Sequence, residues 1–121
     1  MTRTFIQTIQ FVKNWECLGM NDDDLRRLEL QILENPQVGK VIRGTGNLRK
    51  MRFAFENQGK SGSTRVCYVD FVICETVYLI TVYPKSEKDN LSQSERNEIK
   101  KLINRLEESL KTGGYGNERR I

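Results

Sequence analysis

Residues 44–88 decide the fold of this chain, and they read GTGNLRKMRFAFENQGKSGSTRVCYVDFVICETVYLITVYPKSEK. Three runs within this stretch, 48–55, 64–73 and 76–83, are rich in β-branched and aromatic residues and therefore predict strands. Polar Gly/Ser-rich residues separate the first two runs, and Cys74-Glu75 separates the last two. Connections this short join antiparallel neighbours, so the three runs predict an antiparallel meander.

Basic residues lie at or near an end of each run. If the strands pair as predicted, these cations gather on one face or edge of a small sheet and form a phosphate-binding surface. In the first run, the alternation of side chains places Lys50 and Arg52 on one face. Met51 and Phe53 then point to the opposite, buried face. The basic residues of the meander are Arg49, Lys50, Arg52, Lys60, Arg65, Lys85 and Lys88.

The segment before the meander predicts a short strand and a helical hairpin. Residues 3–7 have the composition of the strand, and apolar residues at helical spacing continue from residue 8 until Gly19. Asn21 is a strong helix N-cap, and the three acidic residues that follow it suit the first turn of a second helix. That helix ends at Asn35, because a residue before proline avoids the helical conformation. Residues 37–45 predict a loop.

A final helix follows the meander. Ser92 and Glu95 have the spacing of a capping box, and they predict a helix over 93–111 that a glycine pair ends. The element order β-α-α-β-β-β-α indicates the α+β class. We expect a single domain over residues 1–112, followed by a disordered tail over residues 113–121.

Two glycine-containing segments attract attention. Gly44 and Gly46 lie so close together that they predict a tight turn or a backbone that approaches another group. Residues 59–61 read GKS, as in a phosphate-binding loop, but that motif needs a glycine where Ala54 stands and a helix where a strand follows. A nucleotide-binding loop is therefore rejected.

Length and composition are those of one soluble globular domain: 121 residues, 37% hydrophobic and 30% charged. The net charge of +4 is mildly basic and is most simply explained by a soluble surface, while the alternative is an attraction to polyanions. The absence of His removes the commonest acid–base group and metal ligand. Three Cys without metal-ligand spacing predict neither zinc nor a disulfide framework, so no cofactor is expected. The N-terminus lacks a signal peptide pattern, and no apolar run approaches the ~20 residues of a membrane helix, which favours a reducing cytoplasm.

A site built from Lys and Arg suits phosphoryl chemistry. An RNA strand supplies its own nucleophile, the 2′-OH, so the protein has to position the strand, neutralise developing charge and move protons. Crowded cations also lower the pKa of a neighbouring Lys, which can then act as a base. Taken singly, each cation is more simply explained as a solvated surface charge, whereas several around one sheet favour a site.

Three segments of the meander carry a resemblance to the RelE/HigB-type toxins of bacterial type II toxin–antitoxin systems, within the RelE/ParE superfamily and nearest to its HigB branch. They are GTGNLRKMRF over 44–53, the GKSGS loop that leads into Arg65-Val66, and the strand YLITVY that closes on PKSEK at 84–88. The resemblance covers about residues 5–110. It implies the RelE/ParE-like fold, with a short strand, a helical hairpin, a three-stranded antiparallel meander and a C-terminal helix.

The resemblance also implies a function and a set of site residues. It implies a ribosome-dependent mRNA endonuclease that inhibits translation, and a cognate HigA-like helix-turn-helix antitoxin through which alone operator DNA is bound. By position, Arg65 matches the arginine that contacts the scissile phosphate, and Lys50, Arg52 and Lys85 match other basic residues of the catalytic site. Residues assigned to RNA or ribosome binding are Lys60, Lys88 and Arg49.

The chain departs from the family at one point, because it has no His, and its Tyr115 stands too far into the tail to match the Tyr or His that many members carry near the chain end as a proton-transfer group. Lys50 or Lys85 is our interpretation of the base. Two alternatives stay open. A gyrase-inhibiting toxin of the ParE type would not need the basic cluster, and a non-catalytic RNA-binding module would display stacking aromatics, whereas Tyr68 and Tyr78 have the pattern of core residues.

Overall fold

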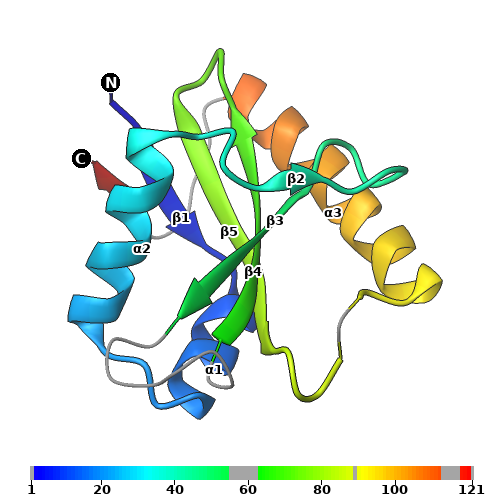
Figure 1. Ribbon diagram of the computed structural model, residues 1–121. Helices are drawn as coiled ribbons and strands as arrows, with labels where there is room; N and C mark the ends of the chain where they lie inside the picture. Colours follow the sequence, from blue (N-terminus) through cyan, green and yellow to red (C-terminus); the bar gives the residue numbers. More distant parts are fainter. Residues whose placement is uncertain (1, 55–62, 89, 113–117, 121) are drawn as a thin grey trace.

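The predicted meander forms the centre of a six-stranded sheet with the order β2-β3-β4-β5-β1-β6 (Figure 1). β3 (Arg49–Ala54), β4 (Ser63–Phe71) and β5 (Thr76–Pro84) pair antiparallel, as expected. β1 (Thr4–Gln7) lies parallel to β5 on its other side. This computed structural model describes residues 2–54, 63–88, 90–112 and 118–120.

The edges of the sheet differ from the sequence-based expectation. β2 (Lys40–Val41) pairs antiparallel with β3 inside the segment predicted as a loop. β6 (Glu118–Arg120) pairs antiparallel with β1, where a disordered tail was expected, while residues 113–117 lie outside the described residues. Strands of two or three residues are too short for a period-2 pattern, so pairing with their neighbours defines them.

The predicted helices are confirmed, and local capping groups set their starts. Asn21 and Asp24 form a reciprocal capping box, with the Asp24 N–H donating to Asn21 Oδ1 over 2.8 Å. Ser92 and Glu95 form the second box, as their spacing predicted. The helices are α1 (Ile9–Cys17), α2 (Asp22–Glu34) and α3 (Gln93–Lys111).

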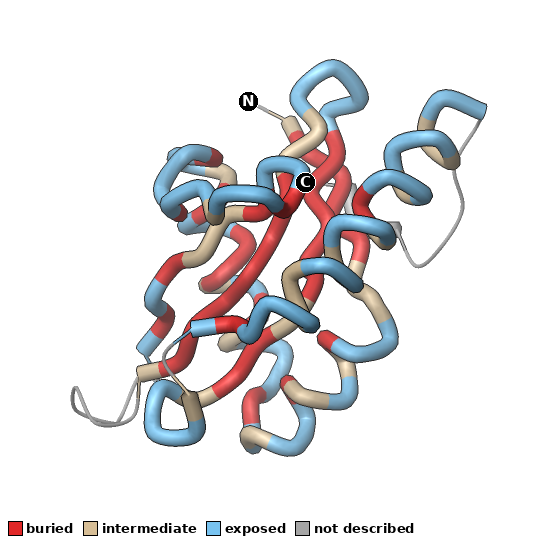
Figure 2. Tube along the Cα trace, turned by 90° about the vertical axis from the view of Figure 1, so that its right-hand side faces the viewer, coloured by how far each residue is buried: buried red, intermediate tan, exposed pale blue. Residues whose placement is uncertain are grey.

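Helices cover both faces of the sheet (Figure 1). α1 and α2 pack on one face, where the rings of Phe11 and Trp15 stack with centroids 5.3 Å apart and Trp15 also contacts Phe53 of β3. α3 covers the other face through Ile103, which is 2% exposed. The central strands are buried and the outward sides of the helices are exposed (Figure 2). Among the described residues, no helix has both the length and the apolar character needed to cross a membrane.

Tyr68 of β4 fixes the segment between α2 and β2. Its buried hydroxyl donates to the carbonyl of Pro36 over 2.8 Å and accepts the N–H of Gly39 over 3.0 Å. A Cβ at Gly39 would lie 2.9 Å from Tyr68 Cε1, so this position requires glycine. The predicted core role of Tyr68 is confirmed.

A β-bulge in β5 changes which side chains face α3. Cys67 lies opposite Thr81, but its neighbour Tyr68 lies opposite Leu79, so Ile80 is an extra residue. Beyond the bulge the alternation is shifted by one residue. Tyr83 consequently faces α3, the same side as Arg65, and does not join the core beneath α1 and α2.

Candidate functional site

Three neighbouring strands bring Arg52, Arg65 and Tyr83 into one row. Arg52 of β3 lies directly opposite Arg65 of β4, and Arg65 lies directly opposite Tyr83 of β5. Directly opposed residues point to the same face of a sheet, and here that face is the one covered by α3. Lys50 stands two residues before Arg52 on β3 and therefore shares this face. We call Lys50, Arg52 and Arg65 the basic cluster.

Arg65 is the most enclosed cation of the basic cluster. It is only 6% exposed, whereas Arg52 is exposed and Lys50 is partly exposed. Burying a guanidinium costs desolvation energy, and placing Arg52 directly opposite adds repulsion between like charges. An enclosed arginine directly opposite a second arginine is an arrangement that can bind an anion.

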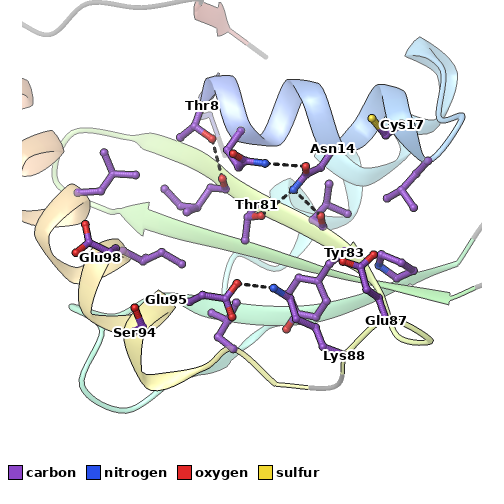
Figure 3. A pocket seen from close by; sticks show the side chains of 18 residues that line it. Thr8, Asn14, Cys17, Thr81, Tyr83, Glu87, Lys88, Ser94, Glu95 and Glu98 are labelled. Carbon is purple, nitrogen blue, oxygen red and sulfur yellow. Dashed lines mark hydrogen bonds and ion pairs between the residues drawn. The ribbon is translucent and has the colours of Figure 1, made fainter.

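Lys88 reaches the same face from the loop after β5. Its Nζ lies 5.0 Å from the centroid of the Tyr83 ring and forms an ion pair with Glu95 Oε2 in the first turn of α3 (Figure 3). The hydrogen bond from Lys88, together with one from the Ser92 backbone N–H, lowers the pKa of Glu95. Glu95 therefore holds Lys88 over the Tyr83 ring as a charged carboxylate.

Two buried groups below Lys88 keep their protons at neutral pH. Burial raises the pKa of the Cys67 thiol to about 12, and burial also raises the pKa of the Tyr83 hydroxyl. Cys67 lies opposite Lys50 across the β3–β4 pair. Neither Cys67 nor Tyr83 can accept a proton from a substrate in this environment, because their neutral forms are strongly favoured.

The structure places one of the other predicted residues, Arg49, away from the basic cluster. Arg49 lies on the α1–α2 side opposite Tyr68, where its Nη1 donates to the carbonyl of Gly39 over 2.7 Å. This hydrogen bond holds the loop before β2 in place. Lys85 is exposed just after β5, beside the first residue of β4, since its backbone N–H donates to the carbonyl of Ser63. Lys60 lies outside the described residues.

A cavity of about 750 Å³ opens beside the cluster, between α1, β5 and α3 (Figure 3). The free edge of β5 on this side is covered by α1, since Thr8 Oγ1 donates to the carbonyl of Ile80 and Asn14 Nδ2 donates to that of Val82. Among the described residues that line the cavity, Glu87, Glu95 and Glu98 are acidic and Lys88 is the one cation. An acidic cavity does not attract a polyanion, so it lies outside the candidate anion site.

Sequence reasoning missed Tyr83 and Glu95 as parts of the site. Strict alternation from Leu79 puts Tyr83 on the α1–α2 side, and only the bulge at Ile80 turns it to the basic cluster. The sequence pattern identified Glu95 as the capping partner of Ser92, and it did not indicate the ion pair of Glu95 with Lys88. The cation-rich face suits positioning and charge neutralisation of a phosphodiester.

Comparisons with known proteins identify the family and support the fold. The sequence model of a family described as "RelE toxin of RelE / RelB toxin-antitoxin system" matches residues 6–112. A solved structure of the E. coli toxin RelE, a double arginine-to-alanine mutant in the free state, superposes with a TM-score of 0.57 and 18% sequence identity. The match covers 81% of this chain and 97% of that chain, and at this identity it supports the fold.

Proposed function

Because the chain belongs to the RelE toxin family of the RelE/RelB toxin–antitoxin system, we propose that it is a toxin that cleaves mRNA on the ribosome and thereby inhibits translation. The proposal extends to the HigB branch and to a cognate HigA-like helix-turn-helix antitoxin as partner. In this proposal the toxin reaches operator DNA only through that antitoxin. The GTG-x-LRK, GKSG and PKSEK segments support the branch assignment.

The observation that carries the proposal is the direct opposition of Arg52 and Arg65 on the face below α3. Two guanidinium groups at opposed positions can bind the two non-bridging oxygens of one phosphate, which relieves their mutual repulsion. Lys50, two residues along β3, adds a third cation on the same face. Such a set stabilises the extra negative charge that a phosphodiester gains as it is attacked.

The proposed reaction uses the RNA as its own nucleophile. A base takes the proton of the 2′-OH, the 2′ oxygen forms a bond to phosphorus, and the bond from phosphorus to the 5′ oxygen breaks. The departing oxygen takes up a proton, so the products are a 2′,3′-cyclic phosphate and a 5′-OH end. Arg65 and Arg52 bind the phosphate, and Lys50 or Lys85 serves as the base. Burial raises the pKa of the Cys67 thiol and of the Tyr83 hydroxyl, which favours their protonated forms, so the proposal assigns neither of them the role of base.

The test uses purified protein with ribosomes that translate a defined message, and primer extension to locate cuts. We expect cuts with the native protein and a loss of rate of about 10²–10³-fold in Arg65→Ala and Arg52→Ala. Arg52 is exposed, so its removal leaves the core intact. Arg26→Ala is the matched control, because Arg26 is an exposed arginine of α2, on the other face of the sheet.

Other outcomes assign the protein to another class. Binding of RNA without cuts would identify a binding module. An intact message together with loss of gyrase supercoiling activity would identify a ParE-type toxin. Equal activity of Arg65→Ala, Arg52→Ala and the control would remove the basic cluster from the mechanism.

A further inference from the structure

A second, smaller cavity lies beside the basic cluster, between β2, β3 and the first turn of α3. It has a volume of about 250 Å³. Three cations line it from three different elements: Lys40 of β2, Lys50 of β3 and Arg96 of α3. Its other lining residues are Val41, Ile42, Asn90 and Leu91. We call it the β2–α3 pocket.

Placing the positive charges of this pocket close together lowers the stability of the sheet. Lys40 lies directly opposite Lys50 in the β2–β3 pair, and like charges at directly opposed positions destabilise a sheet. None of the described residues that line the pocket is acidic. The Lys50 ammonium donates to Asn90 Oδ1 over 2.9 Å, so a neutral amide is one of its partners.

Arg96 differs from two other cations of α3, Lys101 and Lys111. Lys101 and Lys111 each form an ion pair with a glutamate three residues earlier, at 3.5 and 3.6 Å. Three residues before Arg96 stands the neutral residue Gln93. Its Oε1 accepts a hydrogen bond from Arg96 Nη2 over 3.0 Å. Within the described part of the chain, neither Arg96 nor Lys40 forms an ion pair, and the buried Arg96 Nε has no hydrogen-bond acceptor.

We propose that the β2–α3 pocket binds a backbone phosphate of the RNA strand adjacent to the phosphate held at Arg52 and Arg65. The inference rests on the proposed function and adds Lys40 and Arg96 to the residues that contact RNA. Lys50 and Arg52 are separated by ~7 Å along β3, so one strand can contact both places with neighbouring phosphates. The acidic cavity on the other side of the α3 N-terminus keeps the strand on the β2–β3 side.

The experiment measures the binding of a short, fully 2′-O-methylated single-stranded RNA by fluorescence anisotropy at several salt concentrations. This probe lacks the nucleophile, so binding is measured without cleavage. We expect the double variant Lys40→Ala/Arg96→Ala to raise Kd roughly five- to twentyfold. We also expect the slope of log K against log salt to become shallower by about 0.7 for each phosphate that the variant no longer neutralises.

The matched control is Lys100→Ala/Arg105→Ala, which removes the same charge from exposed positions of α3 outside the pocket. Equal effects in the two double variants, or no binding by the native protein, would overturn the proposal. Binding of inorganic phosphate that the pocket variant loses, together with RNA affinity that is equal in the pocket variant and its control, would assign the pocket to the free ion and also contradict the proposal.

The binding result is independent of the cleavage result. If the native protein cuts messages and the pocket variant binds like its control, the pocket assignment fails and the proposed function stands. If no cuts occur and the pocket variant still shows weaker binding and a shallower salt slope, the proposed function fails and the phosphate site stands.

Discussion

Glu95 links the first turn of α3 to Lys88, which lies on the α3-covered face of the sheet beside the candidate site. Its Oε1 accepts the Ser92 N–H over 2.9 Å, and its Oε2 pairs with Lys88, which in turn lies over the Tyr83 ring. The hydrogen bond from Lys88 is the main cause of the lowered pKa of Glu95, and the Ser92 N–H adds to it. A carboxylate with these partners both caps the start of the helix and orients a cation.

The lowered pKa predicts a pH-dependent contribution to stability. Because the folded-state pKa of Glu95 lies below its ordinary value of 4.5, the contribution is present above that value and is lost as pH falls through the folded-state pKa. Glu95→Gln keeps the capping geometry and removes the charge. We expect the native protein to be more stable than this variant near neutral pH, with a gap that closes below about pH 4.

Urea unfolding at several pH values checks this expectation. Glu107→Gln is the control, because Glu107 is an exposed residue of the same helix that has no ion pair within the described part of the chain. A gap between native protein and Glu95→Gln that stays constant from neutral to acidic pH would show that the Lys88 contact contributes nothing through charge.

Among single residues, strand alternation was enough to predict the common face of Lys50 and Arg52 and the burial of Met51 and Phe53. The same alternation put Arg49 on the opposite face, and there it supports a loop. Its role as an RNA contact stays a prediction that the geometry does not favour. Side-chain partners across the sheet depend on register, which sequence pattern alone leaves open.

At the scale of elements, the turn between β2 and β3 packs closely against α3. Gly44 and Gly46 have φ of 76° and 74°, a left-handed conformation that suits glycine. A Cβ at Gly46 would lie 3.3 Å from Ile103 Cγ2, whereas a Cβ at Gly44 would have no neighbour within 4 Å. The sequence allowed either a tight turn or a close approach, and Gly46 provides both.

The pair of glycines offers a controlled test of this packing. We expect Gly44→Ala to lower the free energy of unfolding by about 1–2 kcal/mol, because it carries only the backbone strain. Gly46→Ala should lower it by about 1 kcal/mol more, because its methyl group also crowds Ile103. In an Ile103→Ala background, which removes Cγ2, the extra cost should disappear. Equal costs for the two alanine variants in urea unfolding would contradict the contact.

Elements with local signals were predictable and elements that depend on partners were not. The capping residues predicted where α2 and α3 begin, and the apolar runs predicted the bounds of the long strands to within a few residues. β2 and β6 consist of two and three residues, and only pairing with β3 and β1 defines them. The bulge at Ile80 likewise arises from pairing with β4.

At the scale of the whole molecule, charge is divided around the N-terminal end of α3. Glu87, Glu95 and Glu98 line the large cavity toward α1, while the β2–α3 pocket and the basic cluster lie toward β2 and β3. In our proposal the net charge of +4 attracts RNA from a distance, and this division of charge favours binding on the β2–β3 side. Composition indicates the net charge, but only the folded sheet shows on which side the cations gather.

The central claim is that this molecule cuts translated messages with Arg65 at its site. Mapping of mRNA 5′ ends in bacterial cells after brief induction tests it most directly, with Arg65→Ala and the control Arg26→Ala induced in parallel. We predict new 5′ ends at in-frame codon positions for the native protein and for Arg26→Ala, and none for Arg65→Ala. Growth arrest with intact messages, or the same cuts in Arg65→Ala, would contradict the claim.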